Sequence, residues 1–487
     1  MINALYDIDA LRTIETHAGE GAALMERAGQ AGWRAVLEHW PLARRIAVVC
    51  GPGNNGGDGA VLARHAHASG REVVTVRLDD HAPRGDMAQA MHARLHAAGV
   101  AVHADVAAIQ GCDVVVDAVL GIGLARAPDG VMRTALDAIN AAGVPILALD
   151  VPSGVDARTG FVFQGAVRAT RTIEFIAPKV GLRTGAARGH VGALQVADLD
   201  LDASAFAGIT PAAQRLDASD LARWFAPRAL DSHKGAHGRV LCIGGDVGHG
   251  GAILLAAEAA LRSGAGLVDI DTRARHVSAA LARIPEAMPH ATHNTEALRD
   301  RIAHATTCVL GPGLGQGAWG LLRFDACIAH AAQLVLDADG LNLLAMHASA
   351  VPPNTILTPH PGEAARLLGC GAHDVQMDRF DAARQLADRY DAVVVLKGAG
   401  TVVAAKGQVA RVIDAGNPGM AVGGMGDVLA GVIGALRAQG LAAFDAACAG
   451  ALLHSIAGDA AAFEGERGLL PRDLMPHLRR LVNPVSR

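Results

Sequence analysis

Short apolar runs alternate with helical segments along this chain, and glycines or aspartates follow each run. In the first half these runs are Arg45–Cys50, Glu72–Arg77, Cys112–Asp117 and Pro145–Asp150. Apolar runs of about four to eight residues between helical patterns are typical of buried parallel strands. The pattern therefore predicts an α/β fold with a doubly wound sheet, whose ligand crevice lies at the carboxyl ends of the strands.

A second series of such runs follows in the second half of the chain. Its members are Val240–Gly244, Gly266–Asp271, Thr307–Leu310, Gln333–Asp337, Asn354–Thr358 and Ala392–Leu396, followed by a hairpin of 401–405 with 409–413. We expect a second α/β sandwich that ends in an antiparallel hairpin. Residues 198–216 lose the periodicity and contain Pro211. Because 487 residues exceed one ordinary core, the sequence predicts two domains, 1–212 and 213–487.

The composition fits two aliphatic cores and excludes several classes of partner. Apolar residues make up 51% of the chain and aromatic residues only 3%. A net charge of −5 gives no electrostatic support for nucleic-acid binding. The seven cysteines are scattered without a CxxC pair, which is typical of reduced core thiols. With no basic-then-apolar N-terminal segment and no apolar run near about 20 residues, we expect a soluble cytoplasmic protein that does not enter a membrane.

A glycine-rich stretch, 414–427, directly precedes a long apolar helical run. Its glycines stand at positions 416, 419, 423, 424 and 426, and Asp427 ends it. The first amides of a helix have no partner within the helix and carry roughly +0.5 of a charge, so this junction can hold an anion such as phosphate. Asp427 can cap the helix, or it can accept a proton from a hydroxyl that attacks a phosphoryl group.

Another glycine loop, Gly51–Gly59, follows the strand Arg45–Cys50 and precedes a predicted helix over Ala60–Ser69. A strand, a glycine loop and a helix in this order form the context of a dinucleotide or phosphate site. The side chains of Asn54, Asn55 and Asp58 add polar groups to the loop. A tight turn that binds no ligand is the alternative.

Carboxylates and a hydroxyl follow the next strands, with Asp117 at one strand end and Asp150 and Ser153 at another. Such residues also cap helices and close turns. Together they form an oxygen-rich set that suits a hard monovalent cation, and no histidine–cysteine set indicates zinc or iron. Segments 175–181 and 189–192 are predicted to form a closing strand pair, and Lys179 is expected to be solvated.

Four loops in the second half carry the polar residues of that domain. They are Gly311–Gly315, Asp337–Asn342, Thr358–Glu363, in which two prolines flank His360, and Lys397–Thr401, where a cation and glycines follow a buried strand. Each is ordinary alone. The last of them precedes the glycine-rich stretch by one hairpin, which favours a nucleotide phosphate as its ligand.

The first 210 or so residues resemble the NAD(P)H-hydrate epimerases, which have a Rossmann-like doubly wound sheet. The resemblance rests on NNGGDG (54–59), Asp117, GxGxxR (121–126) and DxPSG (150–154). It implies that Asp150 is the acid/base group and that Asn55, Asp117 and Ser153 bind K⁺. The residues implied to bind the substrate are Asn54, Asn55, Gly56, Gly57, Asp58, Gly121, Ile122, Gly123, Leu124, Ala125, Arg126, Ala127 and Asp150.

The remainder resembles the ADP/ATP-dependent NAD(P)H-hydrate dehydratases, which have a ribokinase-like α/β sandwich. The motifs are GGxxxxxGA (244–252), GPGLG (311–315), DADGLN (337–342), TPHPGE (358–363), KGxGT (397–401) and GGMGD (423–427). The resemblance implies that Asp427 is the catalytic base and that Mg²⁺ accompanies ADP. It places Ala252, Gly313, Gly315, His360 and Asp427 on the substrate, and Lys397, Gly398, Ala399, Gly400, Thr401 and Gly426 on the nucleotide.

The sequence thus predicts a bifunctional enzyme that repairs hydrated NADH and NADPH with ADP as phosphoryl donor, and we expect a homo-oligomer. Two alternatives remain open at this point. A small-alcohol kinase fused to a Rossmann-like domain would share the glycine-rich stretch, but it would not need NNGGDG and DxPSG. The first domain could also bind a dinucleotide without turning it over.

Overall fold

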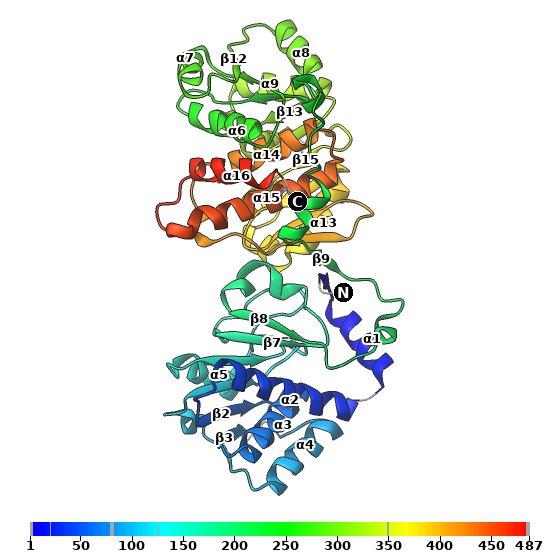
Figure 1. The fold of residues 1–487 in the computed structure, drawn as a ribbon, viewed down its shortest axis with the longest axis vertical. Helices are drawn as coiled ribbons and strands as arrows, with labels where there is room; N and C mark the ends of the chain where they lie inside the picture. The colour runs from blue at the N-terminus through cyan, green and yellow to red at the C-terminus, as the bar shows by residue number, and fades with distance from the viewer. Residues whose placement is uncertain (1–2, 20, 78–81, 125, 348–349, 484–487) are drawn as a thin grey trace. The chain divides into compact units, whose positions relative to one another are not determined.

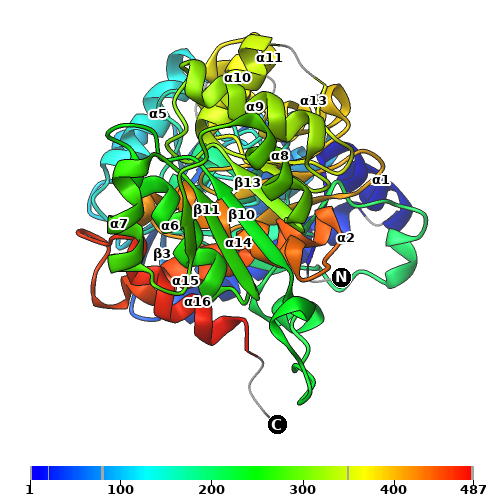
Figure 2. The same ribbon diagram turned by 90° about the horizontal axis from the view of Figure 1, so that it is seen from above.

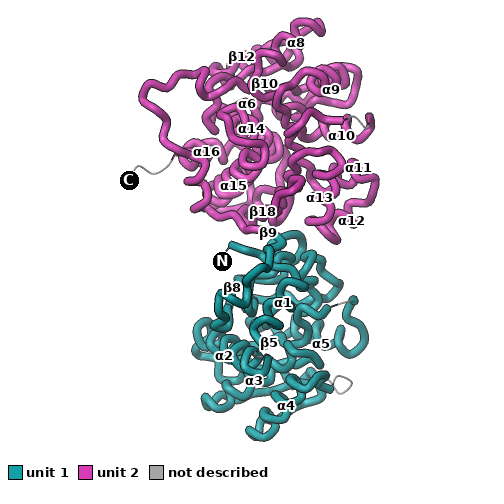
Figure 3. The backbone as a smooth tube through the Cα atoms, turned by 90° about the vertical axis from the view of Figure 1, so that its right-hand side faces the viewer, with its two compact units in different colours: residues 1–213 teal, residues 214–487 magenta. Residues whose placement is uncertain are grey.

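The computed structural model describes residues 3–19, 21–77, 82–124, 126–347 and 350–483. The chain forms two compact units, Met1–Ala213 and Gln214–Arg487, which Figure 3 colours separately. Each unit has a largely parallel sheet with helices on both faces (Figure 1). The predicted α/β class is therefore confirmed for both halves.

The sheet of the first unit has the order β4-β3-β2-β5-β6-β7-β8, and neighbouring strands pair in parallel. The strands are β2 (Arg45–Cys50), β3 (Glu72–Arg77), β4 (Val102–His103), β5 (Val114–Ala118), β6 (Ile146–Leu149), β7 (Arg171–Phe175) and β8 (Ala193–Ala197); β1 is Ala4–Leu5. Successive strands run outward from β2 in one direction and from β5 in the other. The loops after β2 and β5 therefore flank the switch point, where a ligand crevice is expected.

Helices cover both faces of this sheet. They are α1 (Ile8–Ala18), α2 (Gly21–His39), α3 (Asn54–Ala68), α4 (Asp86–Ala97) and α5 (Gly130–Ala141). Ile46, Val48 and Cys50 of β2 pack with α2 and α3. Ala47 and Val49 point to the other face, where α5 lies. This alternation follows from the two-residue period of a strand, and it explains why β2 is apolar throughout.

Helix α3 begins at Asn54, so the prediction that the helix starts at Ala60 is wrong. The glycines of the NNGGDG block lie inside the helix and permit close packing. A Cβ on Gly56 would lie 1.9 Å from the Gly51 carbonyl oxygen, and one on Gly59 would lie 2.6 Å from the Ala118 Cβ. The block is glycine-rich because the first turns of α3 pack directly against the strand ends, where a Cβ would not fit. Helix propensity does not take such tertiary packing into account, so it placed the start of the helix too late.

The predicted strand pair 175–181 with 189–192 is also wrong. The strands are β7 and β8, and the segment between them contains the short 3₁₀ helices η2 (Gly181–Arg183) and η3 (Gly185–Gly189). Glu174 interrupts the apolar pattern of β7, although its side chain is fully buried and pairs with Arg183 at 2.5 Å. Because a residue of this buried ion pair breaks the apolar pattern, the sequence did not predict the strand.

The second unit contains the order β18-β17-β16-β15-β14-β13-β10-β11-β12. The strands are β10 (Arg239–Ile243), β11 (Leu267–Asp271), β12 (Met288–His290), β13 (Thr307–Leu310), β14 (Leu334–Leu336), β15 (Ile356–Leu357), β16 (Val393–Leu396), β17 (Thr401–Ala404) and β18 (Ala410–Ile413); β9 is Ala213–Arg215. Only the β16-β17-β18 pairings in this order are antiparallel, as the predicted hairpin requires. The sequence patterns had missed β12, whose three residues include a proline and a histidine.

Two helical layers enclose this second sheet (Figure 2). The helices are α6 (Gly250–Arg262), α7 (Ala274–Arg283), α8 (Thr295–His304), α9 (Ala318–His330), α10 (Ala338–His347), α11 (Pro361–Leu368), α12 (Ala372–Met377), α13 (Arg379–Tyr390), α14 (Met425–Ala438), α15 (Ala443–Ala461) and α16 (Met475–Leu481). Helices α6, α14 and α15 share one core with Val240 and Val309. Helix α9 lies on the other face, where Cys327 contacts Cys308 of β13.

One stretch of the described chain, Ala443–Glu464, is long and apolar enough to span a membrane by composition. It consists mainly of α15, and 67% of its most apolar window is buried inside the unit. It therefore serves as a core helix beside α14.

Candidate active sites

A cavity of about 610 Å³ lies at the switch point of the first unit. It is bounded by the loops after β2, β5 and β6 and by α1 and α2. Its polar lining comprises Arg12, Glu15, Thr16, Asn54, Asn55, Asp58, Arg84, Asp150 and Lys179. The cavity has the size of a small-molecule site and lies at the expected edge of the sheet.

Asp150 is held in this cavity by a buried ion pair. Its backbone has a φ of 65°, a left-handed conformation that is costly for a residue with a Cβ. One carboxylate oxygen, Oδ1, lies 2.5 Å from Lys179 Nζ and also accepts a hydrogen bond from the Phe175 amide. Lys179 is 1% exposed, so the expectation of a solvated lysine is wrong. Sequence reasoning named Lys179 but missed its pairing with Asp150, because β7 and its loop bring the lysine back to the end of β6.

The Asp150 carboxylate raises the pKa of two other acids in the cavity. Burial raises the pKa of Asp58 well above its usual range, and the nearby Asp150 and Glu15 carboxylates raise it further. The pKa of Glu15 is raised by burial and by Asp150. A buried lysine among several carboxylates is an arrangement in which protons can be exchanged at neutral pH.

The three residues predicted to bind K⁺ lie near the same strand ends. Ser153 Oγ donates to Asp117 Oδ1 at 2.6 Å, and the Ser153 amide donates to Asp117 Oδ2 at 2.8 Å. Burial raises the pKa of Asp117 to about 6. The Asn55 side chain is 7% exposed, and neither its oxygen nor its nitrogen has a hydrogen-bond partner in the described structure. An orphaned buried amide after β2 and a buried carboxylate on the neighbouring strand β5 fit an oxygen-liganded cation.

The other residues predicted for this site divide into four groups. Asn54, Gly121, Ile122 and Gly123 line the cavity, whereas Gly56 and Gly57 lie buried in α3. Leu124, Arg126 and Ala127 are on the same loop but are absent from the described lining of the cavity. Ala125 lies outside the described residues.

In the second unit, α14 begins directly after Gly424, whose φ is 98°. Gly426 and Asp427 occupy the first turn of the helix, where the amides have no partner within the helix. A Cβ on Gly426 would lie 3.2 Å from Lys397 Nζ and 3.5 Å from Asp337 Oδ2. The fold therefore brings the KGxGT and GGMGD motifs together at one helix N-terminus.

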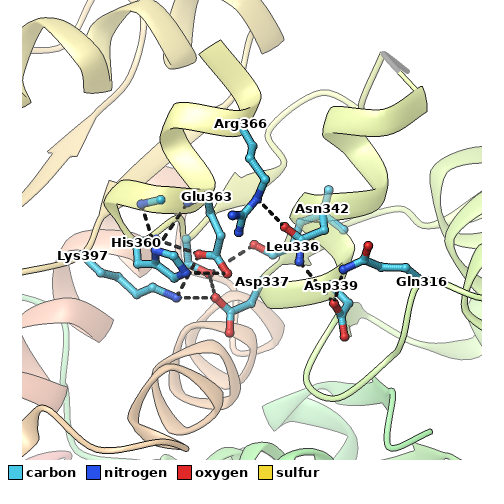
Figure 4. A network of polar contacts seen from close by, with 11 residues as sticks. Gln316, Leu336, Asp337, Asp339, Asn342, His360, Glu363, Arg366 and Lys397 are labelled. Carbon is cyan, nitrogen blue, oxygen red and sulfur yellow. Dashed lines mark hydrogen bonds and ion pairs between the residues drawn. The ribbon is translucent and has the colours of Figure 1, made fainter. Parts of the chain in front are cut away.

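A polar network surrounds Lys397 (Figure 4). Its Nζ lies 2.6 Å from Asp337 Oδ1, which also accepts a hydrogen bond from Thr358 Oγ1. Glu363 Oε2 lies 3.8 Å from the same Nζ and accepts a hydrogen bond from the His360 amide. The His360 ring is fixed as the N-cap of α11, because Nδ1 accepts from the Gly362 amide at 3.0 Å. The network fixes both a cation and an imidazole beside the start of α14.

These charges act on Asp427. Burial raises the pKa of Asp427 to about 7, the Asp337 carboxylate adds to the rise, and the Lys397 ammonium opposes it. A carboxylate with a pKa near neutrality is suited to general-base catalysis. For Lys397, burial lowers the pKa, but the two carboxylates outweigh burial and the net direction is upward.

The residues predicted to contact the substrate lie on neighbouring loops of this unit. A Cβ on Gly313 would lie 3.2 Å from the Ala252 Cβ, so the GPGLG loop packs on the start of α6. The Gly315 amide donates to Asp339 Oδ2 at 2.9 Å, and Asp339 also accepts from Gln316 and Asn342 (Figure 4). The glycines at 313 and 315 have φ values of 59° and 72°, which a residue with a Cβ rarely adopts.

Sequence reasoning had not singled out Asp337, Glu363 or Asp459. The first two belong to motifs that were recognised. Asp337 directly follows a strand and Glu363 lies just after the N-cap of α11, and these positions were the sequence signals that could have identified them. Asp459 of α15 accepts hydrogen bonds from the Gly416 amide and from Asn417 Nδ2, at 2.9 and 3.0 Å. It anchors the glycine-rich stretch from a helix that no local pattern connects with it.

Family comparisons agree with this arrangement. Residues 240–480 match the family described as NAD(P)H-hydrate dehydratase, and residues 21–181 match the YjeF-related protein N-terminus. The bifunctional NAD(P)H-hydrate repair enzyme of Escherichia coli is 46% identical over 463 residues, which cover 95% of this chain and 89% of the relative. The corresponding enzyme of Coxiella burnetii is 46% identical over 99% of this chain and 100% of its own length.

This chain belongs to the family of bifunctional NAD(P)H-hydrate repair enzymes. The resemblance inferred from the motifs is confirmed in both halves. Two solved structures match the second unit. A ribokinase-like superfamily protein from Enterococcus faecalis has a TM-score of 0.53 and 29% identity, over 56% of this chain and 95% of its own. An ADP/ATP-dependent NAD(P)H-hydrate dehydratase from Bacillus subtilis, co-crystallized with ATP and Mg²⁺, has a TM-score of 0.50 and 28% identity, over 54% and 95%.

Proposed function

We propose that this protein repairs hydrated NADH and NADPH, with the epimerase in residues 1–212 and the ADP-dependent dehydratase in residues 213–487. The observation that carries the proposal is the position of Asp427. It stands in the first turn of a glycine-preceded helix, beside Lys397 and Asp337, with a pKa of about 7. Family membership at 46% identity over the full length supports both activities.

In the dehydratase unit, Asp427 takes the proton from the hydroxyl of the hydrated ring as that oxygen attacks the terminal phosphorus of ADP. The unpaired amides around Gly426 and the ammonium of Lys397 stabilise the charge that develops on the phosphoryl group, and AMP leaves. The original bond between the ring carbon and the phosphorylated oxygen then breaks, pushed by the lone pair of the ring nitrogen, and inorganic phosphate leaves. Loss of a proton from the adjacent carbon restores the dihydronicotinamide.

We assign the nucleotide to Lys397, Gly398, Ala399, Gly400, Thr401 and Gly426, and the substrate to Ala252, Gly313, Gly315, His360 and Asp427. Mg²⁺ bound with the nucleotide would neutralise part of the phosphate charge. The described residues contain no group of three or more His, Cys, Asp or Glu side chains placed to hold a metal. Such a site fits an ion that keeps several waters and binds mainly through the phosphates.

In the epimerase unit, we propose Asp150 as the proton-transfer group at the hydrated ring. Lys179 Nζ lies 2.5 Å from its Oδ1 and fixes the carboxylate in a buried place. The amides and side chains of Asn54, Asn55 and Asp58 and the loop from Gly121 to Ala127 hold the phosphates and ribose. The unequal environments of Asp150 and Asp58 suit a base paired with an acid.

We further propose K⁺ as the ion that Asn55, Asp117 and Ser153 bind. The unpartnered Asn55 amide and the buried Asp117 support this assignment. Replacing K⁺ in the buffer with a bulky organic cation is expected to slow epimerisation in the wild type. Asp117→Ala should abolish that dependence, and a variant that epimerises like wild type at every K⁺ concentration would remove the ion from this site.

A homo-oligomer and a cytoplasmic location complete the proposal. All seven cysteines are unpaired, and six of them are buried, as expected of a protein kept in a reducing compartment. Light scattering of the purified protein measures the oligomeric state directly.

The central test uses mixed epimers of hydrated NADH with ADP and Mg²⁺, followed by the absorbance of the reduced ring. Asp427→Asn should lower ADP-dependent recovery by roughly 100- to 10,000-fold, the usual loss of a general base. The same variant should interconvert the epimers at the wild-type rate. Asp150→Asn should show the reverse pattern. If either variant loses both activities while melting normally, the division of chemistry between the units is wrong.

A further inference from the structure

A second cavity of about 610 Å³ opens at the carboxyl ends of β11 and β12 in the second unit. Its cationic or polar lining residues are Thr272, Arg273, Arg275, Thr292, His293, Asn294 and Arg323, and its apolar ones include Val247, Leu322 and Trp319. No aspartate or glutamate is among the described lining residues. Arg273 and Arg323 pair with the carboxylates of Asp246 and Asp271 outside the lining, and Arg275 forms no ion pair with the described residues, so the excess positive charge that favours an anionic ligand comes from Arg275.

Two of these arginines are fixed in place by the protein. Their guanidinium groups lie against the Trp319 ring, with Arg273 at 4.5 Å and Arg323 at 3.9 Å from its centre. Arg273 Nε lies 2.6 Å from Asp246 Oδ1, and Arg323 Nε lies 2.7 Å from Asp271 Oδ2. Guanidinium groups held in this way lose little entropy when they bind an anion.

Other groups in the cavity have capacity left for a ligand. Arg275 is exposed and forms no ion pair with the described residues. Thr292 Oγ1 is buried without a hydrogen-bond partner in the described structure. Val247 and Leu322 are 51% and 42% exposed, which is unusual for large apolar side chains and offers a surface for a base or a ribose.

The cavity adjoins the proposed dehydratase site. Asp246 connects the two, because its Oδ1 binds Arg273 and its Oδ2 would lie 2.8 Å from a Cβ on Gly315. The Asp246 amide also donates to the Gly313 carbonyl at 2.6 Å. Gly313 and Gly315 are the residues that we assign to the hydrated ring, so Asp246 contacts groups of both sites.

We propose that this cavity binds the adenylate half of the dinucleotide substrate, an inference that rests on the proposed dehydratase function. Its phosphate groups lie on Arg273 and Arg275, and its base lies against Val247 and Leu322. A bare phosphate would not need the apolar wall, and a purely apolar ligand would not need the arginines. A free adenine nucleotide shares the same chemistry, but contact with the Gly313–Gly315 loop favours a ligand that reaches the reacting ring.

The test compares Arg275→Ala with Arg299→Ala, an exposed arginine of α8 outside the described lining of the cavity. Full-length protein is assayed with hydrated NADPH at saturating ADP. Arg275→Ala should raise KM for the dinucleotide roughly tenfold, as expected for one lost charge-assisted contact, with kcat and KM for ADP unchanged. Arg275→Lys should recover part of the loss, and Arg299→Ala should match wild type. Equal KM values in Arg275→Ala and wild type would overturn the proposal.

Adenosine 2′,5′-bisphosphate separates the two sources of the ligand. It should compete with the dinucleotide in wild type and compete less well in Arg275→Ala. If it changes kcat without raising KM for the dinucleotide, the cavity serves a free nucleotide and the proposal is wrong. Should wild type recover no NADPH at all, the proposed function fails instead. Calorimetric titration with the bisphosphate then still tests whether the cavity binds an adenylate group. Equal affinity in wild type and Arg275→Ala would refute that proposal.

Discussion

At the scale of single residues, both proposed reactions depend on carboxylates that are buried beside a lysine. Asp150 with Lys179 and Asp427 with Lys397 share this design, although the lysines lie at different distances along the chain. For Asp427, burial raises the pKa to about 7 and the Lys397 ammonium opposes that rise, so this carboxylate can exchange protons near neutrality.

The pH dependence of the dehydratase follows from Asp427. A general base must be deprotonated, and its pKa in the folded protein is raised to about 7. The kcat/KM for ADP-dependent dehydration should therefore fall as the pH drops below about 7. Because the folded pKa exceeds the unfolded value, this group also makes wild type lose stability as the pH rises from about 4 to about 7.

Asp427→Asn removes that titration, so its melting temperature should rise relative to that of wild type across the same window. Kinetics and thermal melting over this pH range check both statements. A flat kcat/KM profile over roughly one pH unit on either side of that pKa would exclude Asp427 as the base.

At the scale of secondary-structure elements, glycines set the distance between helices and their neighbours. Helix α3 presses its NNGGDG turns onto β2 and β5, and α14 crosses α6 at Gly431. A Cβ on Gly431 would lie 2.0 Å from the Ala256 carbonyl oxygen. The same close packing holds the first turn of α14, with Asp427, against the loops of the site.

Gly431→Ala should destabilise the second unit by about 1 to 3 kcal/mol. The energetic cost of the steric overlap with the backbone exceeds the roughly 1 kcal/mol gained in helix propensity. Gly251→Ala is the matched control, since a Cβ at that position of α6 meets nothing within 4 Å. Urea unfolding measures both. Equal urea midpoints for Gly431→Ala and wild type would show that α14 and α6 can move apart without loss of stability.

At the scale of the whole molecule, each of the two units has its own apolar core and its own switch point between parallel strands. Buried apolar clusters lie on both faces of the first sheet, and a further large cluster joins α6, α14 and α15 to the second. Each unit has more than enough residues for an independently stable domain.

Residues 1–212 and 213–487, expressed separately, should therefore each fold, the first with epimerase activity and the second with dehydratase activity. Circular dichroism during heating and the two assays check this, and an equimolar mixture of the fragments is the control. A fragment that melts without a cooperative transition would show that the units depend on one another for stability.

The sequence by itself determined the fold class, the family and most of the loops that carry polar residues. Strand periodicity is a local property, so β2, β3 and β13 were predicted residue for residue. Glycine-rich motifs are also local, and one of them led to Asp427 because backbone amides need space at a phosphate, whereas Asp150 was found at the end of a predicted strand.

Only the tertiary structure decided which distant side chains meet. Lys179 reaches Asp150 across the turn after β7. Lys397, which follows β16, reaches Asp337, which follows β14. Asp459 of α15 holds the glycine-rich stretch. The arginine cavity beside Trp319 likewise draws its residues from four separate segments. Ion pairs and cavities depend on packing between segments that no local pattern links, and burial then sets the pKa values that make these residues chemically useful.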